Sequence, residues 1–148
     1  MLRYIVASLL FVCLLVYAEP YKLKWLAGGE FILHEPSEFT LVDKAAEFDF
    51  YVVNTSINTD TNPVKRILTM VEYHDTKVLV PIDTPVKRMY TEGTINCDAG
   101  IAVLMVEFWV GTGNNLIFVH NQVANESIVE LLTPNTTRNK LYKKVCNK

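Results

Sequence analysis

Three histidines are the side chains in this sequence best suited to metal binding or acid–base chemistry. His34, His74 and His120 lie far apart along the chain, and no Cys-x-x-Cys or His-Glu-x-x-His motif accompanies them. Pairing of strands could still bring His120 near another ligand. We expect all three histidines at strand edges or on the surface, and we predict no metal site and no cofactor.

Nucleophiles are equally sparse. No Gly-x-Ser-x-Gly motif occurs, and two of the few serines belong to glycosylation motifs. Cys97 is followed by Asp98 and could be drawn as a thiol nucleophile, but a second cysteine in an exported chain favours a disulfide. Nothing in the sequence sets two carboxylates across a cleft, as glycoside hydrolysis requires. The sequence therefore predicts no catalytic residues and a protein that is not an enzyme.

The glycines and basic residues do not point to phosphate or nucleic acid. No Lys-Ser or Lys-Thr pair follows Gly111-x-Gly113, and turns of hairpins use glycine for positive φ. The basic residues are scattered, and the formal net charge is −2 at pH 7. Nucleic acid is therefore a poor partner.

The N-terminus is typical of a secretory signal peptide. A short positive segment containing Arg3 precedes an apolar run from Ile5 to Tyr17, and Val16-Tyr17-Ala18 resembles a cleavage site. We predict a signal peptide over residues 1–18 and one all-β domain over 19–148, in a secreted, extracellular protein without a stable membrane anchor. An uncleaved anchor is the alternative.

Cleavage after Ala18 would remove Arg3 and Cys13, leaving a net charge near −3 and two cysteines, Cys97 and Cys146. In an oxidising compartment such a pair predicts one disulfide. Its loop of about 50 residues corresponds to an upper estimate of about 4 kcal/mol in the chain-entropy treatment. Two free thiols or an intermolecular bond are the alternatives.

Three Asn-x-Ser/Thr motifs support export. They begin at Asn54, Asn125 and Asn135, and each predicts a glycosylated surface loop or strand edge.

The densest apolar run outside the N-terminus extends from Gly100 to Val123 and predicts a central β-hairpin. Its first arm, 101–110, is apolar on both faces except at Glu107, so other layers must cover it. The face that carries Met105 and Trp109 is the candidate interaction surface for an apolar ligand, a partner or self-association. The alternative is that helices or a second sheet cover this face. A buried helix is the competing assignment for the run itself.

Shorter strands are expected on both sides of the hairpin. Glu92-Gly93 is expected to be a turn, 127–132 a strand or a short helical turn, and 141–146 a tail fixed by the disulfide. The other expected strands are Tyr21–Trp25, Glu30–His34, Glu38–Asp43, Glu47–Val53, Val64–Asp75 and Lys77–Ile82. This pattern predicts an all-β fold, an antiparallel β-sandwich or partly closed barrel with one disulfide.

The run from Val64 to Val123 resembles the insect multiprotein bridging factor type 2 family of small secreted β-proteins. The resemblance is carried by the segments 66–75, 104–108, 111–113 and 116–119, and near the start by 29–33. Glu30 stands where Asp is usual, and Gly100 stands where the family has two glycines. The resemblance implies a non-enzymatic protein of an insect-type extracellular fluid, with no catalytic residues to transfer.

Three functional hypotheses follow. The first is a secreted binding or interaction protein whose partner is an unknown protein or an apolar small ligand, with a homodimer as a further possibility. The second is a small secreted hydrolase or toxin-like enzyme assembled from distant residues. The third is a transcriptional co-activator, as the family name suggests, which the signal peptide and glycosylation motifs oppose.

Overall fold

The computed structural model describes residues 21–24, 30–33, 36–56, 61–121 and 128–147. A small hairpin of β1 (Tyr21–Lys24) and β2 (Glu30–Leu33) precedes the main sheet. The main sheet contains β3 (Phe39–Lys44), β4 (Phe48–Val53), β5 (Val64–Val78), β6 (Pro85–Asn96), β7 (Ile101–Val110), β8 (Leu116–Asn121) and β9 (Ile128–Glu130). Two 3-10 turns, η1 (Pro36–Glu38) and η2 (Asn54–Ser56), and one helix, α1 (Thr137–Cys146), complete the described chain.

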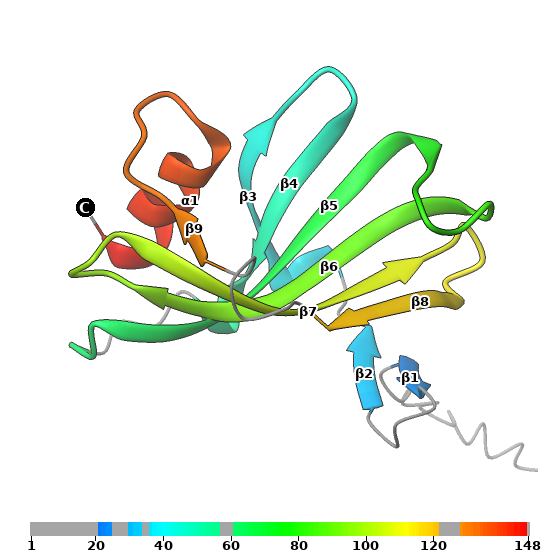
Figure 1. The fold of residues 1–148 in the computed structure, drawn as a ribbon, viewed down its shortest axis with the longest axis horizontal. Coiled ribbons are helices and arrows are strands. Elements are labelled where there is room, and N and C mark those ends of the chain that lie inside the picture. The colour runs from blue at the N-terminus through cyan, green and yellow to red at the C-terminus, as the bar shows by residue number, and fades with distance from the viewer. Residues whose placement is uncertain (1–20, 25–29, 34–35, 57–60, 122–127, 148) are drawn as a thin grey trace, which may run out of the picture.

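The main sheet is an antiparallel meander in the order β3-β4-β5-β6-β7-β8. The far side of β7 is shared, because β9 pairs with Ile101–Val103 and β8 pairs with Val106–Val110. The sheet opens as a twisted fan, with α1 beside β3 at one end (Figure 1), and β3 is not paired with β8. The predicted all-β fold is confirmed, in the form of a sheet that does not close.

A β-bulge at Met105 interrupts the alternation of β7. Leu104 lies opposite Gly93 and Val106 opposite Glu92, so Met105 is the extra residue. A Cβ atom on Gly93 would stand 2.4 Å from the carbonyl oxygen of Val103, which explains why only glycine allows the strands to approach here. As a result, the even-numbered residues of β7 before the bulge and the even-numbered residues after it face opposite sides of the sheet.

Each face of the sheet carries its own apolar cluster. On the face that α1 covers, here called the helix face, Leu141 and Val145 of the helix pack with strand residues such as Ile67. The other members of this cluster are Val52, Ile95 and Ala102 of the strands, Cys97 of the turn after β6, and Leu131 just after β9. The opposite face buries Met70, Tyr90, Phe108 and Val110, with Phe39 of the edge strand packed against them. Burial on both faces explains the nearly continuous apolar sequence of β7.

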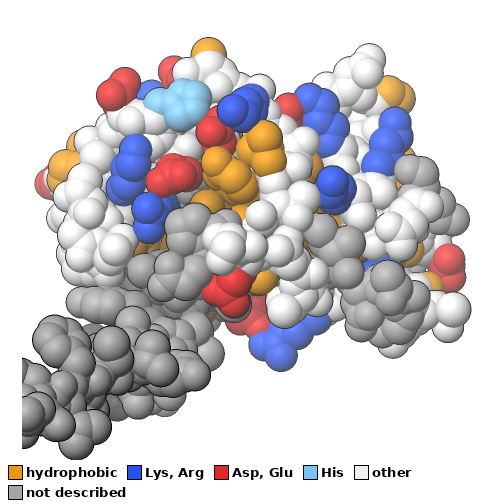
Figure 2. Space-filling view, turned by 180° about the vertical axis from the view of Figure 1, so that it is seen from behind, with side chains coloured by type: hydrophobic (Ala, Val, Ile, Leu, Met, Phe, Trp, Pro, Cys, Tyr) orange, Lys and Arg blue, Asp and Glu red, His pale blue; other side chains and the backbone are white. Residues whose placement is uncertain are grey.

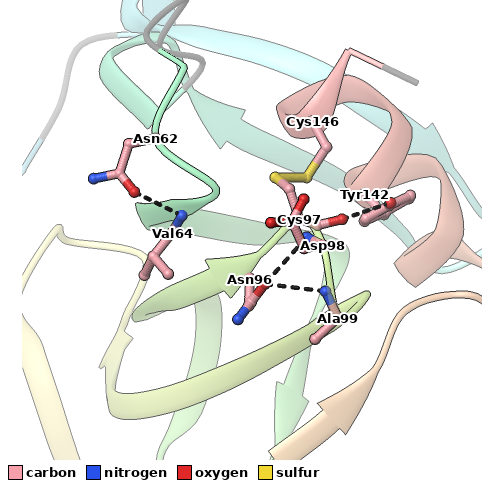
Figure 3. The surroundings of a disulfide bond; sticks show 8 residues. All are labelled: Asn62, Val64, Asn96, Cys97, Asp98, Ala99, Tyr142 and Cys146. Atoms are coloured by element: carbon pink, nitrogen blue, oxygen red, sulfur yellow. Dashed lines mark hydrogen bonds between the residues drawn. A yellow bond between two sulfur atoms is a disulfide. The ribbon is translucent and has the colours of Figure 1, made fainter.

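The disulfide fastens α1 to the turn between β6 and β7. Cys97 and Cys146 are bonded with their Cα atoms 5.6 Å apart, which confirms the predicted pairing. The Tyr142 hydroxyl donates a hydrogen bond to the Cys97 carbonyl at 2.8 Å (Figure 3). Within the turn, the Asn96 side-chain oxygen accepts hydrogen bonds from the backbone N–H groups of Asp98 and Ala99. The helix therefore docks on a turn whose backbone is held in place by the Asn96 side chain.

Three local expectations are wrong. The segment 77–82 is not a separate strand, because β5 continues through Val78 and the chain then turns before β6. Glu92-Gly93 is not a turn but the middle of β6, where the glycine accommodates the bulge. The C-terminal tail is the helix α1, which Thr136 caps by accepting a hydrogen bond from the Asn139 backbone N–H. The predicted signal peptide lies outside the described residues.

Replacing both Cys97 and Cys146 with alanine should lower the free energy of unfolding by about 2–4 kcal/mol, because the unfolded chain loses its cross-link. Urea unfolding followed by tryptophan fluorescence measures the change. Tyr142→Phe, which removes only the hydrogen bond to the Cys97 carbonyl, should cost about 1 kcal/mol.

A reductant supplies the control for this prediction. It should destabilise the wild-type protein by the same amount and leave the double alanine variant unchanged. Equal stability of the oxidised and reduced wild-type proteins would contradict a structural role for the bond.

Candidate binding cleft

A cleft of about 330 Å³ lies on the helix face, between the sheet and α1. Its floor comes from β4, β5, β6 and β7, and its wall comes from β9, the segment after it and α1. The lining residues are Phe48, Phe50, Ile67, Thr69, Val71, Met89, Thr91, Ala102, Leu104, Glu107, Val129, Leu131, Thr137, Arg138 and Leu141. Most of these side chains are apolar, and Phe48, Phe50 and Val71 are only partly buried by the protein itself. The cleft therefore presents apolar surface that a small molecule could cover.

The wall formed by α1 is held in place by polar contacts with β3 as well as by the disulfide. The Asp43 carboxylate accepts hydrogen bonds from the Thr137 hydroxyl at 2.6 Å and from the Lys140 ammonium group at 2.5 Å. The Asn139 side chain is buried and donates a hydrogen bond to the Leu131 carbonyl. These contacts hold α1 in position, and Thr137, Arg138 and Leu141 of this helix line the cleft.

The polar groups of the cleft are few. The Thr69 hydroxyl donates to the Thr91 carbonyl, and the Thr137 hydroxyl donates to Asp43, so both are already engaged. Glu107 and Arg138 are the charged lining residues. Among the residues that the structure describes, no serine, cysteine or histidine lines the cleft. The described lining residues therefore combine an apolar surface with one acidic and one basic side chain, and none of them is a serine or cysteine nucleophile.

The candidate surface of Met105 and Trp109 is not one exposed surface, so that prediction is wrong for Trp109. Met105 is 51% exposed, whereas Trp109 is 6% exposed. The bulge at Met105 places Trp109 opposite Met89, and its ring packs at a tilt of 46° against Phe118 with centroids 4.8 Å apart. The Trp109 indole N–H has no acceptor among the residues that the structure describes. Trp109 is therefore a core residue beside the cleft.

Other exposed apolar side chains occur on β7, which carries Met105, and on β9. Val103 and Ile128 are opposite each other in these strands, and both are exposed. Figure 2 shows hydrophobic side chains reaching the surface near the middle of one face of the molecule, with charged side chains of both signs around them. Because Val103, Met105 and Ile128 are exposed and do not line the cleft, apolar surface is present outside it as well.

Two histidines contact carboxylates, and the third, His34, lies outside the described residues. The Nε2 atom of His74 is 3.2 Å from Asp49, and its Nδ1 atom is 3.1 Å from the Ala46 carbonyl. The Nδ1 atom of His120 is 3.7 Å from Glu107. Within the described ranges, no group of three histidine, cysteine, aspartate or glutamate side chains lies close enough to hold a metal ion.

Two of the three glycosylation motifs can be placed. Asn54 and Asn135 are both exposed, Asn54 at the start of η2 and Asn135 just before α1. The Asn54 side chain accepts a hydrogen bond from the Thr40 hydroxyl at 2.6 Å. Asn125 lies outside the described residues. Occupancy at all three positions stays a prediction.

No model of a known protein family matches this chain, and no curated protein matches it. The resemblance to the multiprotein bridging factor type 2 family stays a prediction. Of the helices in the described part of the chain, none has the length and apolar character needed to cross a membrane.

Asp43 should make folding stability depend on pH. Hydrogen bonds from Lys140 and Thr137 lower the pKa of Asp43, although its burial opposes this. Because the folded-state pKa is lowered, the contribution is complete above the unfolded value of about 3.9 and is lost as the pH falls through the folded value. Asp43→Asn should therefore lower the free energy of unfolding by about 1 kcal/mol near neutral pH, and by less in acid.

Urea unfolding at a series of pH values measures this difference. Asp83→Asn, at an exposed aspartate in the turn between β5 and β6, is the matched control and should show no comparable loss near neutral pH. A wild-type advantage over Asp43→Asn that persists unchanged in acid would contradict the proposed role of the carboxylate.

Proposed function

We propose that this protein is a secreted, glycosylated, non-enzymatic binding protein that holds a small apolar ligand in the cleft beneath α1. The observation that carries the proposal is the lining of the cleft, which is mostly apolar and is contributed by five strands and one helix. Apolar surface left in a concave site gains free energy when a ligand removes it from water.

The size and construction of the cleft support a ligand rather than a collapsed core. Its volume of about 330 Å³ lies at the small end of the range of about 300–1,000 Å³ seen for small-molecule sites. The helix that would have to move to close it is held by a disulfide, by Asp43 and by the Tyr142 hydrogen bond. A rigid wall keeps the cleft formed before a ligand arrives, which lowers the cost of binding.

The chemistry of the lining favours binding over catalysis. A hydrolase built on this cleft would need an activated nucleophile, and the hydroxyls of Thr69 and Thr137 are committed to acceptors in the protein. Glu107 has His120 nearby, but His120 does not line the cleft. The secreted hydrolase hypothesis therefore lacks the arrangement it requires among the lining residues.

Export rests on the sequence and is supported by the disulfide. The signal-like segment 1–18 and three glycosylation motifs predict passage through an oxidising compartment, where a bond such as Cys97–Cys146 forms and persists. Exposure of Asn54 and Asn135 fits the attachment of glycans at these positions.

Val71→Trp should weaken the binding of a neutral apolar probe, octanol, by at least about tenfold, because the larger side chain occupies the cleft. Isothermal titration calorimetry on the secreted, glycosylated protein measures the affinity. The matched control is Val78→Trp, which adds the same side chain to an exposed position of the same strand.

Both tryptophan variants must keep a cooperative unfolding transition for the comparison to count. Equal loss of octanol binding in the two variants would contradict a ligand site in this cleft.

Mass spectrometry of the protein secreted from insect cells tests the extracellular part of the proposal. We expect a chain that begins at Glu19, one disulfide, and glycans on Asn54, Asn125 and Asn135 that an amidase removes. Measurement under native conditions should also show a non-covalent mass retained from the cells. A chain that stays inside the cells with residues 1–18 attached and both thiols free would contradict it.

A further inference from the structure

Glu107 stands out among the residues of the cleft. It is the one charged residue of β7. It follows the bulge at Met105, which shifts the alternation of the strand so that the Glu107 side chain is on the helix face. Its side chain is 17% exposed, and its neighbours in the lining include Thr91, which lies opposite it on β6. A carboxylate is therefore held on the floor of a cleft whose other floor residues are apolar or are threonines.

Within the described part of the chain, little compensates for this charge. Among ion pairs between described residues, the partner of Glu107 is His120, at 3.7 Å and charged only when protonated. His120 is also 45% exposed, so solvent screens its effect. A partly buried carboxylate costs free energy unless a cation or a hydrogen-bond donor accompanies it.

Tyr73 lies near Glu107 on the helix face of the sheet. Burial raises the pKa of Tyr73, the Glu107 carboxylate raises it further, and Lys77 acts in the opposite direction. Tyr73 follows Val71 on the same face of β5, so it lies next to the lining of the cleft without being part of it.

Arg138 is the competing charge of the cleft. It lies in the first turn of α1, is exposed, and forms no ion pair with Glu107 within 4.0 Å among the pairs described. Because the guanidinium group is solvated and the carboxylate is largely enclosed, an electrostatic interaction with a ligand is stronger at Glu107.

We infer that the ligand of this cleft is an apolar molecule with a protonated amine, and that the ammonium group binds the Glu107 carboxylate. The inference rests on the proposed function, since it assigns the ligand class of the same cleft. The apolar part of the ligand covers the surface around Phe50 and Val71, and the ammonium group donates charge-assisted hydrogen bonds to the carboxylate. Glu107 thus determines the specificity of a site whose affinity also depends on apolar contact.

Three probes with the same chain and different head groups test this inference. Octylamine, octanol and octanoate are titrated calorimetrically into the secreted, glycosylated protein at neutral to mildly alkaline pH. We expect octylamine to bind at least about tenfold more tightly than octanol, and octanoate to bind more weakly than octanol. In Glu107→Gln the preference for octylamine should disappear, while the affinity for octanol stays within about twofold of wild type.

Two further variants separate the contribution of Glu107 from the contributions of the two basic side chains near it. Arg138→Gln should keep the preference for octylamine, because the guanidinium group does not provide it. His120→Gln should keep this preference as well, since His120 competes with the ligand for the carboxylate and does not contact the ligand's apolar part. Thermal unfolding of each variant confirms that the fold is retained.

The outcomes distinguish this inference from the proposed function. Equal affinities for octylamine and octanol would overturn the inference and leave an apolar cleft. Tightest binding of octanoate, lost in Arg138→Gln, would overturn it in favour of an anionic ligand. Binding of none of the probes would overturn both proposals. If Glu107→Gln fails to fold, Glu107→Asp provides the test, because a retracted carboxylate should weaken octylamine binding and spare octanol.

Discussion

The β-bulge at Met105 decides which side of the sheet each residue of β7 faces. A strand that alternated without interruption would direct Leu104 and Phe108 to the same face. With one extra residue, Leu104 lies in the cleft while Phe108 is buried on the opposite face. Glu107 and Trp109 turn to the helix face for the same reason. The chemical character of the cleft therefore depends on a single local irregularity, which Gly93 makes possible by leaving room for the backbone of β7.

The helix α1 supplies a second layer over the sheet, which the meander of strands does not provide by itself. An antiparallel sheet of this kind has two apolar faces, and one helix of ten residues covers only part of the helix face. The uncovered part, between α1 and the middle strands, is the cleft. The helix is short and has few apolar residues, so its position depends on specific attachments: the Thr136 cap, the contacts of Asp43, and the bond to the turn between β6 and β7.

Much of the fold could be predicted from the sequence. The alternation of Phe48, Phe50 and Val52, the two-sided apolar strand before Gly111 and the paired cysteines each correspond to a feature of the structure. The bulge could not be predicted, because Glu92-Gly93 reads as a turn when the partner strand is unknown. The helix was missed because Leu141 and Val145 give too short an apolar period, although the threonine cap before it is a recognisable start. Glu107 was noticeable as the exception in an apolar strand, yet its place in the cleft depends on the bulge. The contacts of Asp43 with α1 span almost a hundred positions and leave no local pattern.

The position of α1 beside β3 has a further consequence for how the protein behaves in concentrated solution. β3 is the first strand of the main sheet, and among the described strands it pairs only with β4. An unpaired strand edge offers a row of backbone donors and acceptors to other chains, and proteins commonly protect such edges with a helix or with charged side chains. Here α1 contacts β3 through Thr137 and Lys140, and Lys44 ends the strand with a positive charge. The disulfide that holds α1 beside the cleft therefore also keeps a cover close to a strand edge that could otherwise pair with other chains, so reduction would favour aggregation as well as the loss of the cleft.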